Sequence, residues 1–255
     1  MSEWKRFAVE RRNDGVTIIT MTRPEKLNAM DQLWFAELTA LMNGLGSEQD
    51  PTRVAVLTGQ GRAFSAGGDI DMFHDLAGDV SRVRPHLRRV YDAFHAVERC
   101  AVPVIAAVNG IAYGGGTELT MACDMALAGE NARFCCKEAA VGLMPGYGIV
   151  RGAEVIGRPW TRYLALSGRI IDAATAERIG LVQHTVPDAD LLPAALTLAE
   201  EVAAHPSLAV RVGKAYLNRG THDGFDESVE AIALLFGTTE HAEAVAAFRA
   251  RRAGN

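Results

Sequence analysis

The sequence contains few of the features that mark a metal site or a disulfide scaffold. Its four cysteines, at positions 100, 123, 135 and 136, form no CxxC pair, and its seven histidines form no HExxH motif. We therefore expect no structural or catalytic metal. A reduced, cytoplasmic protein with buried thiols agrees best with this cysteine usage.

Long apolar runs and basic runs are also missing. No apolar stretch reaches the length of about 20 residues that a membrane-spanning helix needs, and residues 1–15 lack the apolar core of a signal peptide. The formal net charge is −5, and no basic run longer than a pair precedes Arg249, Arg251 and Arg252. We expect a soluble protein that binds neither nucleic acid nor membranes, although a local cluster of cations could still bind an anionic small molecule.

The chain of 255 residues is 49% hydrophobic and contains 25 glycines, an ordinary globular composition with enough residues for a substantial core. Its first half alternates strand and helix patterns, which is typical of an α/β layer structure with parallel strands. The expected elements are a hairpin of strands 6–12 and 15–24 joined at 13–15, a helix 31–46, strands 53–59, 103–110, 124–130 and 132–136, and a helix 70–99 broken around Gly78 and Pro85.

The character of the chain changes near Pro187. Four alanine-rich helical segments follow, at 190–205, 207–220, 224–237 and 240–252. Each is too apolar on one side to stand alone, so we expect these helices to pack on the α/β part or on a neighbouring chain. No internal repeat, low-complexity linker or independent second domain is evident.

Two glycine loops have the same form. "AFSAGGDI" and "AYGGGTEL" each follow a strand and open a helix, so both belong at the carboxyl edge of a parallel sheet, where α/β proteins bind ligands. Backbone N–H groups at a helix start have no partner within the helix, and two that face one point form an oxyanion hole. The alternative is a pair of tight turns at helix starts, with Asp69 as an N-cap.

Two glutamates in apolar surroundings, Glu118 and Glu138, accompany these loops. Glu118 follows Gly115 by three residues, which places both on one helix face. Buried carboxyl groups have raised pKa values that suit general acid–base catalysis near neutral pH. Structural roles are the alternative: Glu118 could favour its helix dipole, and Glu138 could pair with Lys137 or an arginine.

Six segments appear in the order and spacing of one family: "RPEKLNAMD", "AFSAGGDI", "PVIAAVNGIAYGGGTEL", "ACDMALAGENARF", "EAAVGLMPG" and "AERIGLVQHTVP". Over nearly the whole chain, the sequence resembles the crotonase (enoyl-CoA hydratase/isomerase) superfamily. The resemblance implies an α/β fold of the β-β-α spiral type, with an acyl-CoA-binding catalytic core over 1–187. It also implies a C-terminal helical region, 188–255, that builds homotrimers or hexamers made of two trimers.

The same resemblance implies an acyl-CoA thioester substrate, with coenzyme A as part of the substrate and no separate cofactor. The thioester oxygen would lie between the N–H groups of Gly68 and Gly115. Glu118 would activate a water for attack at C3, Glu138 would deliver a proton to C2, and the N–H of Gly146 would help to seat the water. The resemblance thus predicts an enoyl-CoA hydratase of fatty acid metabolism, which adds water syn to a trans-2-enoyl-CoA and gives a 3-hydroxyacyl-CoA.

Further substrate contacts are implied along the chain. The positions that match coenzyme A contacts, or that lie beside the glycine loops, are Lys26, Leu27, Ala66, Asp69, Ile70, Tyr113, Phe248 and either Arg251 or Arg252. A solvated helix end is the alternative for the two arginines. Candidates for the acyl channel are Met72, Phe73, Tyr113, Met144 and Tyr147, with core packing as their alternative. The stretch "PGYGIVRGAEVIG" departs from the "PGxGGTQRL" of many hydratases, which leaves the acyl chain open.

Other functions are compatible with parts of this pattern. A Δ3-Δ2 enoyl-CoA isomerase can work with Glu138 alone, and related folds hydrolyse or decarboxylate acyl-CoA. A non-catalytic acyl-CoA-binding homologue is a different class, against which both intact glutamates argue. A serine hydrolase is disfavoured because neither Ser65 nor Ser167 lies in a G-x-S-x-G motif. The acyl group, the pathway and the choice between trimer and hexamer stay open.

Overall fold

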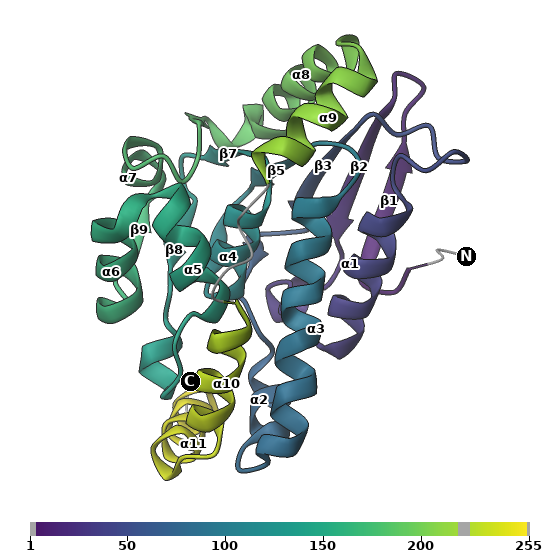
Figure 1. The fold of residues 1–255 in the computed structure, drawn as a ribbon. Coiled ribbons are helices and arrows are strands. Elements are labelled where there is room, and N and C mark those ends of the chain that lie inside the picture. Colours follow the sequence, from purple (N-terminus) through teal and green to yellow (C-terminus); the bar gives the residue numbers. More distant parts are fainter. Residues whose placement is uncertain (1–3, 219–224, 254–255) are drawn as a thin grey trace.

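A six-stranded sheet lies at the centre of the molecule (Figure 1). The computed structural model describes residues 4–218 and 225–253. The sheet has the order β1-β2-β3-β5-β7-β10. Its strands are β1 (Phe7–Arg11), β2 (Val16–Met21), β3 (Val54–Gly59), β5 (Val104–Val108), β7 (Met125–Gly129) and β10 (His184–Val186). β1 and β2 form the expected antiparallel hairpin, and the other neighbours pair in parallel.

Alternate residues of the central strands face two separate hydrophobic layers. Val54 and Val56 of β3 belong to a smaller cluster with the apolar face of α8 (Leu191–Ala204), whereas Ala55 and Leu57 belong to the main core. The strands are therefore apolar on both faces, which is the pattern of a buried parallel sheet. The predicted α/β layer structure is confirmed.

A second sheet of four short strands, in the order β4-β6-β8-β9, lies beside the first. Its strands are β4 (Ala63–Ser65), β6 (Ile111–Tyr113), β8 (Arg133–Cys135) and β9 (Ile171–Asp172). Of these strands, the sequence analysis predicted only β8. The loops expected after β3 and β5 contain β4 and β6, whose three residues are too few to show a period of two. This second sheet carries both glycine loops.

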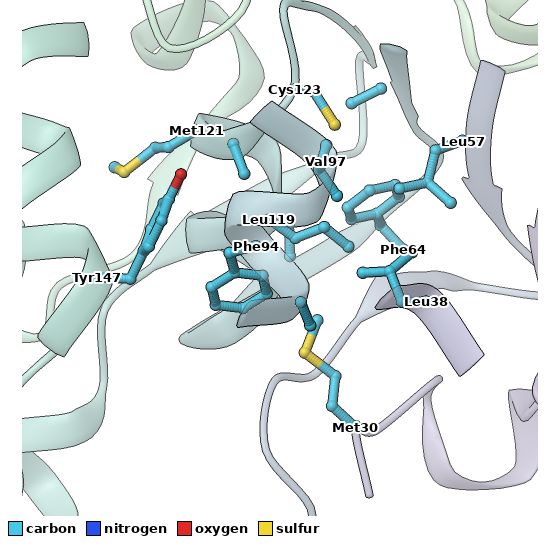
Figure 2. Packing of buried hydrophobic residues seen from close by; sticks show 14 of the residues in the cluster. Met30, Leu38, Leu57, Phe64, Phe94, Val97, Leu119, Met121, Cys123 and Tyr147 are labelled. Atoms are coloured by element: carbon cyan, nitrogen blue, oxygen red, sulfur yellow. The ribbon is translucent and has the colours of Figure 1, made fainter. Parts of the chain in front are cut away.

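Helices surround the sheets. They are α1 (Gln32–Gly44), α2 (Ile70–Leu76), α3 (Val80–Arg99), α4 (Gly115–Ala122), α5 (Gly146–Val155), α6 (Gly157–Ser167) and α7 (Ala173–Arg178), with short 3-10 turns η1 (Pro24–Lys26), η2 (Glu138–Val141) and η3 (Asp188–Asp190). α4 is buried along most of its length. Figure 2 shows its Leu119 among core side chains that include Met30 and Phe94.

The predicted helix break is right at Gly78 and wrong at Pro85. Gly78 has a left-handed φ of 81° between α2 and α3, but Pro85 lies inside α3. An interior proline costs about 3 kcal/mol because one backbone hydrogen bond is lost. Since α3 packs along α1 and α10 and buries a continuous face that includes Leu87 and Phe94, tertiary burial outweighs this local cost.

The C-terminal part is helical, as expected, with α8, α9 (Ser207–Leu217), α10 (Phe225–Phe236) and α11 (Thr239–Ala253). α8 and α9 lie at one end of the molecule and α10 and α11 at the other (Figure 1). α8 covers the sheet, whereas α9 leaves Leu208 and Leu217 75% and 84% exposed. Contact of these side chains with a neighbouring chain, and the division at residue 187, stay predictions. No described helix combines the length and the apolar character needed to cross a membrane.

The glycine run before Glu118 has a packing role at its third position. An ideal Cβ at Gly116 would lie 2.2 Å from the backbone oxygen of Ser65. We expect Gly116→Ala to lower the free energy of unfolding by about 1–3 kcal/mol, because a backbone atom cannot move away as a side chain can. Urea denaturation measures this loss. Gly44→Ala is the matched control, because its Cβ would meet nothing within 4 Å. Its free energy of unfolding should rise by about 0.5–1 kcal/mol. An equal response of both variants would contradict the packing role.

Candidate active site

The two glycine loops approach each other at the starts of α2 and α4. An ideal Cβ at Gly67 would lie 3.0 Å from the N atom of Gly115, and one at Gly115 would lie 3.7 Å from the N atom of Gly68. Only glycine allows this approach, because Gly67 has a φ of 86° and Gly114 a φ of 51°. The second sheet holds the two loops together through the parallel pairing of β4 with β6.

Both N–H groups at this point are available to a ligand. Neither Gly68 N–H nor Gly115 N–H donates a hydrogen bond to any described residue. Both glycines line one cavity of about 760 Å³. Gly115 is the first residue of α4, so the positive end of the helix dipole stands behind its N–H. The pair has the form of an oxyanion hole.

The two predicted glutamates line the same cavity. Glu118 extends from the first turn of α4, and its Oε1 accepts a hydrogen bond of 2.7 Å from the N–H of Gly148. Glu138 begins η2, and its Oε1 would lie 2.7 Å from an ideal Cβ at Gly114. Its Oε2 is buried and has no hydrogen-bond partner among the described residues. Lys137, the sequence-based alternative partner, makes no ion pair with it there.

The surroundings of the two carboxyl groups give them different pKa values. Burial raises the pKa of Glu118 to about 7, although hydrogen bonds from the backbone of Gly148 and Tyr147 oppose the rise. Burial and the negative charge of Glu118 raise the pKa of Glu138 to about 8. Because the N–H groups of Gly148 and Tyr147 stabilise the Glu118 anion, and Glu138 lies beside that negative charge, Glu118 is the better base and Glu138 the better acid.

The first turn of α5 supplies the backbone N–H groups of Tyr147 and Gly148 to Glu118. Gly146 is the first residue of α5 and lines the cavity, and its N–H binds none of the described residues. An ideal Cβ there would lie 2.2 Å from the hydroxyl oxygen of Tyr91. The free N–H beside a carboxylate is suited to hold a small polar molecule such as water.

Most of the predicted substrate contacts lie on the cavity wall. The lining includes Lys26, Leu27, Ala66, Asp69, Ile70, Tyr113 and Phe248. Arg251 is not among the lining residues; its Nε donates to the backbone oxygen of Ala247. The side chain of Arg252 lies outside the described residues. Of the acyl-channel candidates, Phe73, Tyr113, Met144 and Tyr147 line the cavity and Met72 does not.

Asp69 has a clear structural partner. Its Oδ2 forms an ion pair of 2.8 Å with Arg23, and its Oδ1 caps α2 by accepting from the N–H of Asp71. This agrees with the N-cap alternative of the sequence analysis. Asp69 thus fixes the loop that carries Gly68 and has its carboxylate occupied by protein groups.

Several lining residues were not predicted. Arg62 and Lys137 join Lys26 in bringing positive charge to the wall, which suits an anionic ligand despite the net charge of −5. Apolar lining comes from α1, α3 and α10, and its members include Phe35, Leu87, Val90, Phe94, Ile232 and Phe236. Their sequence pattern is that of ordinary amphipathic helices, so no local signal distinguishes them. Among the described residues, no cluster of three His, Cys, Asp or Glu could hold a metal ion.

The arrangement can stabilise a carbonyl oxygen that gains charge while an acid and a base act on neighbouring atoms. This combination is suited to proton transfer or water addition next to a carbonyl group.

Comparison with known proteins gives a consistent picture. A family model described as enoyl-CoA hydratase/isomerase matches residues 11–254. The chain is 35% identical over 250 residues to 2,3-dehydroadipyl-CoA hydratase of Escherichia coli, with 94% of each chain covered. It is 32% identical over 251 residues to crotonyl-CoA hydratase of Syntrophomonas wolfei, covering 96% of this chain and 95% of the relative.

Solved structures share the fold. The crystal structure of an enoyl-CoA hydratase/isomerase from Mycobacterium paratuberculosis superimposes with a TM-score of 0.87 at 30% identity, covering 94% of this chain and 97% of that one. The predicted fold class is thereby confirmed.

Proposed function

The chain belongs to the enoyl-CoA hydratase/isomerase family, and from that premise we propose that it adds water to the double bond of a trans-2-enoyl-CoA thioester. One observation carries this proposal. Glu118 and Glu138 line the same cavity as two N–H groups that no described residue engages. An acid, a base and an oxyanion hole are together what hydration of an α,β-unsaturated thioester requires.

The proposed reaction begins with the thioester oxygen between the N–H groups of Gly68 and Gly115. The Glu118 carboxylate takes a proton from a water that the N–H of Gly146 helps to hold, and the water oxygen bonds to C3. Negative charge then moves through C2 to the thioester oxygen, where the two N–H groups stabilise the enolate. Glu138 gives its proton to C2, so that H and OH add across the double bond and the product is a 3-hydroxyacyl-CoA.

Isomerisation of a 3-enoyl-CoA is the second candidate, because it needs one acid–base group and Glu138 could supply it. Glu118 favours hydration: its Oε1 is held by the N–H of Gly148 beside the unpartnered N–H of Gly146. This geometry gives a water both a base and a hydrogen-bond donor. An enzyme limited to isomerisation has no use for the second carboxylate.

The direct test follows the absorbance of the conjugated thioester in crotonyl-CoA. We expect rapid loss of the absorbance and formation of 3-hydroxybutyryl-CoA, identified by mass. Parallel assays with 3-hexenoyl-CoA detect isomerisation as a gain of the same absorbance. If the absorbance rises with 3-hexenoyl-CoA and no 2-enoyl thioester of any length is hydrated, the proposed activity is isomerisation and not hydration.

The two glutamates also predict a pH profile. Hydration needs Glu118 ionised and Glu138 protonated, so kcat/KM should fall as pH drops through the Glu118 pKa of about 7 and as pH rises through the Glu138 pKa of about 8. We expect a bell-shaped profile with a maximum between these values. A profile that stays flat from pH 5 to pH 10 would contradict the assigned roles.

A further inference from the structure

Four aromatic rings form one wall of the cavity and lead away from the glutamate pair. The ring of Tyr147, at the start of α5, lies next to that of Phe94 (Figure 2), and the two ring centroids are 5.0 Å apart. The ring centroid of Phe94 lies 6.4 Å from that of Phe35, and the ring centroid of Phe35 lies 5.8 Å from that of His86. All four residues line the cavity. The row of rings therefore runs from the start of α5, where the N–H of Gly148 binds Glu118, to His86.

His86 is held in one orientation and one tautomer. Arg89 Nη1 donates to Gln32 Oε1 at 2.6 Å, which turns the amide nitrogen of Gln32 toward His86. Gln32 Nε2 lies 2.9 Å from His86 Nδ1. Since the amide nitrogen can only donate, Nδ1 must accept, and the ring hydrogen is on Nε2.

This leaves a neutral donor on the cavity wall. His86 is 2% exposed, and burial together with the charge of Arg89 lowers its pKa to about 4, so the ring is uncharged at neutral pH. Nε2 makes no hydrogen bond with any described residue. Most other lining residues from the same helix and from α10 are apolar, including Leu87, Val90 and Ile232; Tyr91, whose hydroxyl lies beside Gly146, is the polar exception. A purely apolar chain in this space would leave the Nε2–H unpaired, which is costly.

We propose that the substrate's acyl chain carries an oxygen acceptor, a hydroxyl or a carboxylate, at the end remote from the thioester, and that His86 Nε2–H binds this oxygen. The inference rests on the proposed function for the placement of the acyl chain. His86 is then a specificity-determining residue: it takes no part in the reaction and selects the far end of the chain.

The test uses binding, so that it does not depend on turnover. Isothermal titration compares saturated acyl-CoA thioesters of four, six and eight carbons with a methyl, hydroxyl or carboxylate end, such as hexanoyl-CoA, 6-hydroxyhexanoyl-CoA and adipyl-CoA. We expect an oxygen-terminated ligand of at least one length to bind about fivefold or more tighter than its methyl counterpart. The hydroxyl and carboxylate arms tell which oxygen is preferred.

His86→Phe keeps a ring and removes the donor, and should bring the preference to within about twofold. Gln32→Leu keeps the imidazole of His86 but removes the donor that fixes its tautomer, so it should weaken the preference. It replaces His86→Phe as the test variant if that protein does not fold. Arg88→Gln, on an exposed position of the same helix, is the control and should keep the preference. Equal binding at every length, or a preference that survives in His86→Phe, would overturn the proposal.

The two proposals fail separately. Selective binding that depends on His86, without hydration of the matching 2-enoyl thioesters, would contradict the hydratase and keep the role of His86. Hydration of these thioesters, with no preference for an oxygen-terminated acyl chain, would support the hydratase and contradict the role of His86.

Discussion

Replacing Glu138 by glutamine should lower kcat for hydration of crotonyl-CoA by about 10²- to 10⁴-fold, and Glu118→Gln should do the same. Glutamine has nearly the same shape but can neither give nor take the proton. Because the two carboxyl groups act as a unit in one reaction, the double variant should lose little more than either single one. Steady-state kinetics with the purified variants measure these losses.

A buried glutamate away from the cavity provides the matched control. Glu37 in α1 is 9% exposed, and its carboxylate accepts the backbone N–H groups of Lys5 and Arg6. Glu37→Gln should cost stability without a comparable loss of kcat. A fall of less than tenfold in either Glu118→Gln or Glu138→Gln would exclude that glutamate as an obligatory acid or base.

The same substitutions should stabilise the fold at neutral pH. A carboxyl group whose folded-state pKa is raised binds more protons when folded than when unfolded, so its contribution to stability is lost as pH rises from about 4.3 toward the folded pKa. For Glu138 that window ends near the pKa of about 8. The gain of Glu138→Gln in free energy of unfolding should therefore be absent at pH 4 and largest at pH 8. Urea melts at both values test this, and a gain that does not change with pH would contradict the raised pKa.

Gly115→Pro should lower kcat by about 10²- to 10³-fold, because it removes one donor of the oxyanion hole. Gly115 is the first residue of α4, a position that accepts proline because the helix does not use that N–H, and the closest contact of the added Cβ is the flexible end of Met30, at 3.1 Å. The ring also fills space that the thioester oxygen would occupy. Kinetics with crotonyl-CoA, after circular dichroism has shown that the fold is retained, measure the effect.

Ser207→Pro is the same change at the first residue of α9, away from the cavity. It should leave kcat within about twofold of the unchanged protein. If Gly115→Pro folds and keeps its kcat within threefold, the Gly115 N–H is not an oxyanion donor.

The candidate catalytic groups were visible in the sequence because each requires a specific residue type. A side chain at Gly68 would meet the ring of Phe73, and one at Gly115 would enter the gap between the two loops; Glu118 and Glu138 are ionisable residues in apolar stretches. Such residues conflict with their local surroundings, which makes them visible without a structure. Their placement in one cavity agrees with the prediction, and their roles await the substitutions above.

The helix and strand pattern was predictable to the same extent. Hydrophobic periodicity indicated the long helices and the buried strands, but not the three-residue strands β4 and β6 or the continuity of α3 through Pro85. In these cases the deciding free energy comes from contacts with distant segments, which a local pattern does not contain.

By itself the sequence determined the family, the glycine loops and the glutamate pair, because short local motifs encode them. Only the tertiary structure decided the rest of the cavity. α1, α3 and α10, far apart in the chain, supply its apolar wall, and the Arg89–Gln32–His86 network lies within it. The ion pair of Asp69 with Arg23 and the unpartnered Oε2 of Glu138 are likewise properties of the folded chain. Burial, tautomers and raised pKa values depend on which groups meet in space, and side chains far apart in sequence meet only when the chain has folded.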